Sequence, residues 1–195
     1  MKEVLPVKIK IGNKNVLYPM PVTVVGAMVN GRPNFIAIAH VGILTRHQPH
    51  LISLSMSKMH YTNAGIKETK TFSVNLMSVE NMVPADYVGT FSGKAVDKSQ
   101  VFEVFYGELK TAPIIAGCPL SMECKLYDVY DLPQFDVFIG EVVETYADEN
   151  VLTDGKADLS KVNPLLFDMT SVQYWSLGKA VGRCWNISRQ YNNSK

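Results

Sequence analysis

The chain has 195 residues, of which 47% are apolar and 19% charged, and its 19 basic and 18 acidic side chains give a formal net charge of +1. This length and composition predict a single folded domain over residues 1–195 and exclude a disordered chain or a coiled coil. The near-zero net charge argues against a nucleic-acid partner. No segment has the roughly 18–20 consecutive apolar residues of a membrane-spanning helix, so we expect no membrane partner either.

Two features of the sequence bear on where the protein works. Residues 1–15 alternate apolar and charged side chains and lack the apolar core of a secretion signal. The three cysteines, Cys118, Cys124 and Cys184, are too few for a disulfide framework. We therefore expect a cytoplasmic protein.

The clearest local signal is the pair Asn30-Gly31, which separates two apolar runs, residues 22–29 and 35–41. Asparagine and glycine both accept the positive φ that a type I′ turn requires. This segment therefore predicts a tight antiparallel hairpin.

A strand and a short helix follow this hairpin. Residues 51–57 alternate, with Ile52, Leu54 and Met56 on one face of a strand and Ser53, Ser55 and Ser57 on the other. A helix is expected over residues 62–70, with Thr62 as its capping residue.

The remainder of the chain continues with strands and short helices. We expect a strand over residues 71–78, a short helix over 79–87 limited by Pro84, strands over 121–129 and 136–146 that form a second hairpin, a loop over 148–164 and a short strand or helix near 171–177. Strands joined mainly by hairpin turns, with no Gly-rich phosphate loop, indicate an antiparallel barrel of about six strands and not a Rossmann domain.

A row of hydroxyl groups is the first candidate for chemistry. Ser53, Ser55 and Ser57 share one strand face, Lys58 follows them, and Thr62 begins the expected helix. Hydroxyls, a lysine and the free N–H groups of a helix N-terminus are the donors that a phosphate needs. Serines on a solvated strand face need no ligand, so the spacing alone leaves both interpretations open.

Two asparagines and the histidines carry weaker signals. Asparagine is a poor strand former, so Asn75 in the middle of a strand requires either solvent or a polar partner such as the edge of a heterocycle. Turn chemistry explains Asn34, which directly follows Pro33. The histidines lack neighbouring cysteines or carboxylates at ligand spacing, so we expect no metal site. No nucleophile–base pair is recognisable, so we expect no catalytic side chain in the protein itself.

Five motifs in order resemble one known family, the flavin reductase-like proteins with an FMN-binding split barrel. They are P-V-T-V-V-G at 21–26 with N-F-I-A at 34–37, S-M-S-K-M-H-Y-T at 55–62, F-S-V-N at 72–75, G-T-F-S-G at 89–93 with D-K at 97–98, and G-E-V at 140–142. The resemblance covers about residues 19–145, with a weaker similarity at 164–178. Within the family, the chain is most similar to flavoredoxin and the archaeal ferric reductases.

The resemblance implies a Greek-key split barrel, a homodimer and one FMN near the subunit interface in each protomer. It implies that Ser55, Ser57, Lys58 and Thr62 hold the phosphate, that the backbone of Asn34, Phe35, Ile36 and Ala37 lines the isoalloxazine, and that Asn75 meets its polar edge or the ribityl chain. It further implies that Ser92 lies in the cofactor-binding segment, that Lys98 reaches the N1/O2 side of the ring or the phosphate, and that Phe167 covers the ring. The redox chemistry would reside on the flavin.

Three functions remain open at this point. The first is an FMN-dependent oxidoreductase or electron carrier that takes electrons from NAD(P)H or a protein donor. The second is a split-barrel module that binds a ligand or partner without turnover, which the absence of a protein nucleophile, acid or base allows. A haem-binding member of the wider group is a third, and no histidine is clearly placed as its axial ligand.

Overall fold

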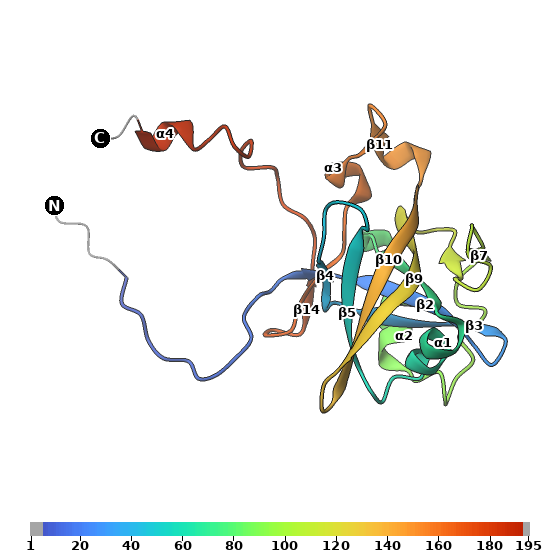
Figure 1. Ribbon diagram of the computed structural model, residues 1–195. Helices are drawn as coiled ribbons and strands as arrows, with labels where there is room; N and C mark the ends of the chain where they lie inside the picture. The colour runs from blue at the N-terminus through green and yellow to red at the C-terminus, as the bar shows by residue number, and fades with distance from the viewer. Residues whose placement is uncertain (1–5, 193–195) are drawn as a thin grey trace.

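A seven-stranded antiparallel sheet forms the body of the computed structural model, which describes residues 6–192. Residues 1–5 and 193–195 of the expected single domain lie outside the described part. The strand order is β3-β2-β6-β9-β10-β5-β4. The bounds are β2 Thr23–Val29, β3 Arg32–Ile38, β4 Val41–Ile43, β5 Leu51–Ser57, β6 Thr71–Leu76, β9 Leu120–Asp131 and β10 Phe135–Ala147. The sheet curls into a half-barrel, which confirms the expected mainly β split-barrel fold (Figure 1).

Short elements surround this sheet. The short strands are β1 Met20–Pro21, β13 Leu166–Asp168 and β14 Gln173–Trp175, which form a three-stranded sheet, and the pairs β7 Val104–Phe105 with β8 Ile114–Ile115 and β11 Leu152–Thr153 with β12 Lys156–Ala157. The helices are α1 Thr62–Thr69, α2 Met82–Thr90, α3 Leu159–Val162 and α4 Arg189–Asn192, with 3-10 turns η1 Val79–Asn81 and η2 Glu149–Val151. The segment 148–164, expected to be a loop, therefore contains several of these elements.

The hairpin of β2 and β3 confirms the turn signal. Asn30 and Gly31 have φ values of 50° and 74°, as a type I′ turn requires. In β5 the apolar face is buried and the serine face is half-buried, so the alternation is also confirmed. Gly140 in β10 lies at a register shift against β9, and a Cβ there would overlap the ring of Phe72.

Two local expectations were wrong. Thr62 does not cap α1: the capping position is Tyr61, without a side-chain bond, and the Thr62 hydroxyl instead accepts a hydrogen bond from Asn34. The second helix extends to Thr90, because Pro84 lies in its first turn, where a missing N–H leaves no helical hydrogen bond unmade.

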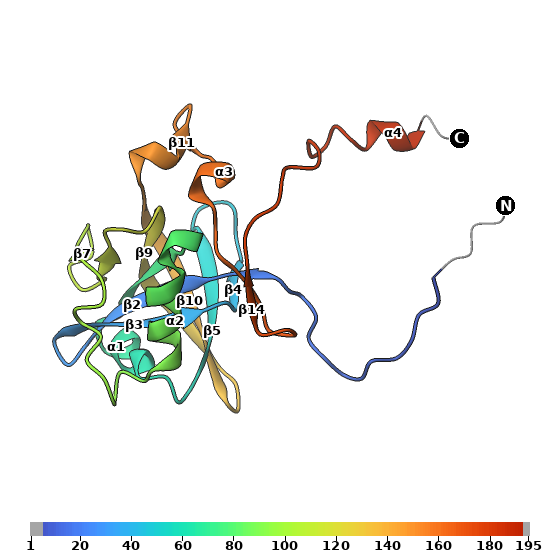
Figure 2. The ribbon, with the colours of Figure 1, turned by 180° about the vertical axis from the view of Figure 1, so that it is seen from behind.

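The core has two parts, one on each side of the sheet. Inside the half-barrel, Leu54, Phe72 and Phe138 are completely buried, together with Cys124, which was expected as packing. On the other side, α2 covers the sheet, as Figure 2 shows from behind. Its Ala85 and Val88 pack with Val24, Phe35 and Met77.

Both terminal segments leave the body on the same side (Figures 1 and 2). They expose apolar side chains along their length: Val7, Ile9, Ile11, Val16 and Leu17 before β1, and Val181, Trp185, Ile187 and Tyr191 after β14. Within residues 6–192, no helix combines the length and the apolarity that crossing a bilayer demands.

Candidate functional site

A cavity of about 490 Å³ opens between the end of β3 and β5, where the sheet does not close into a full barrel. We name it the β3–β5 cavity. Its lining residues are Val22, Ala37, Ile38, Ala39, His40, Ser55, Ser57, His60, Asp86, Gly89, Thr90, Phe135, Phe167, Met169, Val172 and Tyr174. Its volume lies within the range of small-molecule and cofactor sites.

The β3 wall offers backbone groups. A two-residue hairpin turn makes Val29 and Arg32 a hydrogen-bonded pair, and the pairs then alternate along the strands. Phe35 and Ala37 fall at the non-hydrogen-bonded positions, so their N–H and C=O groups point away from β2. Because β3 is an edge strand, no other strand of the sheet uses these groups, and those of Ala37 are free to face the cavity.

The β5 wall offers hydroxyls and an imidazole. Ser55 and Ser57 line the cavity, and the Ser57 hydroxyl accepts a long hydrogen bond of 3.3 Å from the Met59 N–H. His60 follows in the turn before α1, and its Nδ1 is buried without a partner among the described residues. Burial, and then the charge of Lys98, lower the pKa of His60, so its ring is neutral near pH 7 and can either donate or accept a hydrogen bond.

Aromatic rings close the cavity on the side of the small β1-β13-β14 sheet. Phe167 and Tyr174 lie on paired strands with ring centroids 5.8 Å apart. The Tyr174 hydroxyl donates to Asp86 on α2 at 2.9 Å. Burial, with the adjacent Asp86 carboxylate, raises the pKa of Tyr174 to about 12, so the phenol stays protonated.

Asn34, Thr62 and Lys98 do not line the β3–β5 cavity. Asn34 Nδ2 donates to Thr62 Oγ1 at 2.8 Å, and Asn34 and Lys98 line a second cavity of about 450 Å³. The Lys98 ammonium is buried and donates to the carbonyl of Phe35 at 3.0 Å and to that of Val88 at 2.8 Å. Burial lowers the pKa of Lys98 to about 8.

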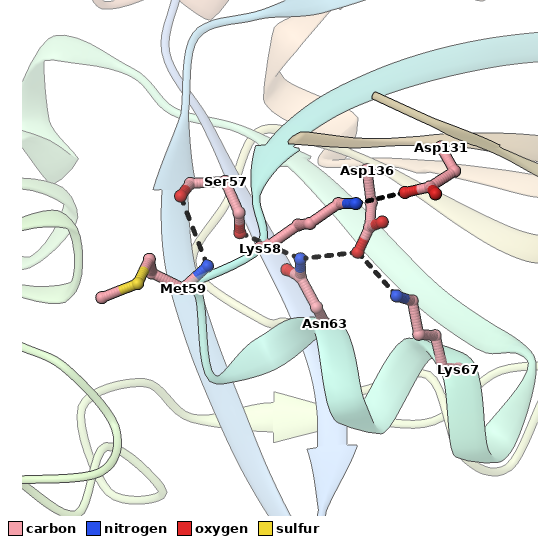
Figure 3. A network of polar contacts seen from close by, with 7 residues as sticks. All are labelled: Ser57, Lys58, Met59, Asn63, Lys67, Asp131 and Asp136. Carbon is pink, nitrogen blue, oxygen red and sulfur yellow. Dashed lines mark hydrogen bonds and ion pairs between the residues drawn. The ribbon is translucent and has the colours of Figure 1, made fainter. Parts of the chain in front are cut away.

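Lys58 points to the opposite side of the turn from Ser57 and pairs with Asp131 (Figure 3). It therefore does not line the β3–β5 cavity, although the residue before it does. Ser92 is exposed, and its hydroxyl accepts a hydrogen bond from the N–H of Lys94. The phosphate residues inferred from the sequence are thus not gathered at one point in this structure.

Of the two alternatives expected for Asn75, solvent is wrong, and the polar partners are groups of the protein itself. It is fully buried, its Nδ2 donates to Val24 and Ser73, and its Oδ1 accepts from the Ile115 N–H. The segment that carries β8 covers this face of β6, and Ser73 also bonds to Pro113 there. No N–H of the Asn75 amide is left for a flavin.

Of the expected side chains, Ala37, Ser55, Ser57 and Phe167 come together in the β3–β5 cavity. Phe35 and Ile36 point into the two core clusters. Sequence reasoning missed His40 and His60 as cavity residues, since an isolated histidine carries no spacing signal. Gly89 stands in a motif that was recognised, and a Cβ there would lie 3.1 Å from that of Ala37. Within residues 6–192 no three or more His, Cys, Asp or Glu side chains are grouped so that they could hold a metal ion.

The cavity thus lies beside an edge strand of the half-barrel, with two serines on the facing strand. The profile of the flavin reductase-like domain matches residues 16–176. The chain belongs to the flavin reductase-like family. Flavoredoxin from Methanosarcina acetivorans is one solved structure that is similar to this chain. The two are 40% identical with a TM-score of 0.92, and the match covers 95% of this chain and 100% of that one.

Two further relatives of this flavin reductase-like protein are informative. Flavoredoxin of Desulfovibrio vulgaris (Miyazaki F) is 32% identical with a TM-score of 0.85, covering 92% of this chain and 98% of that one. A ferric-chelate reductase (NAD(P)H) of Archaeoglobus fulgidus is 28% identical over 137 residues, which are 61% of this chain and 77% of that protein. The match to an Aeropyrum pernix relative spans only 59% of that protein's length.

Proposed function

We propose that this flavin reductase-like protein binds FMN in the β3–β5 cavity and works as an FMN-dependent oxidoreductase or electron carrier. It would take electrons from NAD(P)H or a protein donor and pass them to an acceptor. The observation that carries the proposal is the cavity itself, where unpaired backbone groups of an edge strand face two serines and a buried, unpartnered histidine nitrogen.

The residues of the cavity fit FMN. A flavin ring is flat and largely apolar with a polar edge, and the cavity combines Ile38, Phe167 and other apolar side chains with the outward backbone groups of Ala37. The buried Nδ1 of His60 has no hydrogen-bond partner among the described residues. A polar ligand would therefore form a hydrogen bond with it without breaking an existing one. Ser55 and Ser57 add hydroxyl donors on the facing strand.

When bound, FMN would supply the redox chemistry, and the chain would supply binding, orientation and electrostatics. The backbone of β3 would orient the ring edge, and Phe167 would exclude water from one side. Lys98 is bonded to the Phe35 carbonyl at the open edge of β3, and it carries a positive charge below about pH 8. A cation held there favours negative charge in the cavity, because attraction across a few ångströms of protein is weakly screened.

Lys58 remains part of the proposed phosphate site. Its present partner Asp131 is exposed, with 77% of its side chain accessible, and such surface ion pairs are worth about 0–1 kcal/mol. A phosphate carrying close to two negative charges would compete well for this ammonium.

We also propose that the protein is a homodimer. The two terminal segments expose apolar side chains on one side of the body, and a second copy would bury them (Figures 1 and 2). Support for the redox role comes from the two flavoredoxins and the ferric-chelate reductase that the chain resembles. All three cysteines are free thiols, which suits the predicted cytoplasmic location.

The proposal is tested by titrating the apoprotein with FMN and following the quenching of flavin fluorescence. We expect saturable binding, and about tenfold or greater loss of affinity when Ser57→Leu fills the cavity. Ser53→Leu is the matched control, because Ser53 lies on the same face of β5 but outside the cavity. Equal FMN affinity in wild type and Ser57→Leu, with both folded by circular dichroism, would place the cofactor elsewhere.

Anaerobic addition of NADH or NADPH to the FMN-loaded protein distinguishes the proposed redox function from a binding module without turnover. Bleaching of the flavin absorbance by either nucleotide, or by a reduced protein carrier, supports a redox role. A flavin that none of these donors reduces would favour the binding module.

A further inference from the structure

A second face of the molecule carries a concentration of lysines. On the other side of the turn after β5, a cavity of about 800 Å³ is lined by Lys58, Lys67, Lys70, Lys94, Asp131 and Asp136, among others. We name these six residues and the surface between them the lysine face. It spans the β5–α1 turn, the outer side of α1 and the tip of the β9–β10 hairpin.

The two carboxylates of the lysine face are already neutralised. Asp136, whose side chain is 4% exposed, accepts from Lys67 at 2.6 Å and from Asn63 at 3.4 Å, and Asp131 pairs with Lys58 (Figure 3). Lys70 and Lys94 are exposed and pair with no carboxylate among residues 6–192. Four lysines and two aspartates leave a local excess of two positive charges, on a chain whose total formal charge is +1.

The lysine face lies against the proposed flavin site. His60 lines both the β3–β5 cavity and the cavity of the lysine face, so the two cavities adjoin at this residue. Apolar groups are exposed beside the charges: Met59 is 82% exposed, and Leu132 and Phe135 at the hairpin tip are exposed as well. Phe135 also lines the β3–β5 cavity.

We propose that the lysine face is the docking surface for a small, acidic electron-transfer protein. The inference rests on the proposed redox function. Charged groups at the rim of an interface steer a partner of opposite charge, and a few apolar groups provide close contact. Each encounter would oxidise one reduced carrier by one electron, and two encounters would supply the two electrons of a fully reduced flavin, with protons from solvent.

Apart from Lys58, which the proposed function assigns to the FMN phosphate, the lysine face fits a further nucleotide phosphate less well. A single phosphate is held by donors that converge on one point, commonly by the fork of an arginine. Here the lysines are spread over α1, the β5–α1 turn and residue 94, two of the four are held by aspartates, and no arginine lines the cavity. A spread of point charges matches an extended acidic surface.

The proposal is tested by measuring the affinity of the FMN-loaded protein for an oxidised acidic [4Fe–4S] ferredoxin, at about 20 mM and about 300 mM salt. We expect Lys70→Glu and Lys94→Glu each to weaken binding about fivefold at low salt and to flatten the salt dependence. Lys156→Glu is the matched control: it makes the same charge change on exposed β12, at the opposite end of the molecule from α1 (Figure 1). The rate of flavin reduction by the ferredoxin should follow the same order.

Three results would overturn the docking proposal. In the first, neither Lys70→Glu nor Lys94→Glu changes the affinity for the ferredoxin. In the second, Lys156→Glu lowers that affinity as much as they do. In the third, Lys70→Glu lowers the affinity for FMN or NADPH instead, which would make the lysine face a nucleotide site. In each case, FMN binding by the wild-type protein together with reduction of the bound flavin by NADH or NADPH would leave the proposed function standing. Failure of the wild type to bind FMN would instead remove the proposed function.

Discussion

Lys98 is buried between two carbonyl groups and forms no ion pair with a carboxylate among residues 6–192. Removal of its ammonium from water is the cause that lowers its pKa to about 8, because burial disfavours the charged form. In the unfolded chain the pKa of a lysine is about 10.4. Between these two values the unfolded chain binds more protons than the folded one, so the free energy of unfolding rises with pH in this range. The stability gained in this way is lost again as the pH falls through about 8.

We therefore expect Lys98→Met to remove a rise in stability between about pH 8 and about pH 10 that the wild type shows. Urea unfolding at several pH values measures this difference. Lys156→Met, at an exposed position, should keep the wild-type slope. If Lys98→Met and wild type run parallel across this range, the pKa of Lys98 is the same in the folded and the unfolded chain.

Lys58 tests the phosphate site at the level of one side chain. Because it must leave Asp131 to reach the cofactor, we expect Lys58→Ala to weaken FMN binding about tenfold and Asp131→Asn to leave it equal or slightly stronger. Fluorescence titration of both variants checks the pair. An FMN affinity unchanged in Lys58→Ala would exclude Lys58 from the site.

At the scale of elements, α1 can lie close to β2 because Gly65 has no Cβ. A Cβ on Gly65 would overlap the carbonyl oxygen of Met28 and approach Val29 Cγ2 to 2.8 Å. The backbone of β2 cannot move without disturbing the sheet, so α1 would have to shift. This shift would also move Thr62 at the start of α1, whose hydroxyl bonds to Asn34.

We expect Gly65→Ala to lower the free energy of unfolding by about 1–3 kcal/mol. Gly117→Ala is the control, because nothing lies within 4 Å of a Cβ at that exposed position and its change should stay within about 0.5 kcal/mol. Chemical denaturation of both variants decides the matter. Equal stability of the two would mean that α1 accommodates the methyl group without loss.

At the scale of the whole molecule, the terminal segments are the part that the body of the chain does not bury. Trp185 is 84% exposed and Val181 is 97% exposed, far from the cores of the half-barrel. The N-terminal segment nevertheless reaches the site, since the Tyr18 hydroxyl lies 3.0 Å from His40 Nε2 at the β3–β5 cavity. Burying these segments against a second copy would couple dimer formation to the cavity.

We expect a chain that ends at Lys179 to dissociate at least about tenfold more readily than the full chain. The full-length double variant Val181→Ser, Trp185→Ser should also dissociate more readily than the wild type, because it removes apolar side chains without shortening the chain. Sedimentation equilibrium measures both. A truncated chain as dimeric as the wild type would mean that the C-terminal segment is not part of the interface.

Local pattern in the sequence was enough for the hairpin at Asn30-Gly31 and the alternation of β5, because each depends on the backbone geometry of a few consecutive residues. Order and spacing of short motifs were enough for the family. The tertiary structure alone decided which polar groups share a space. Ser57 and Lys58 are neighbours in the chain but point to opposite sides of a turn, and Asn75 is polar yet buried because a distant segment covers its strand. A side chain's environment depends on what packs against it from far along the chain, and periodicity carries no information about that.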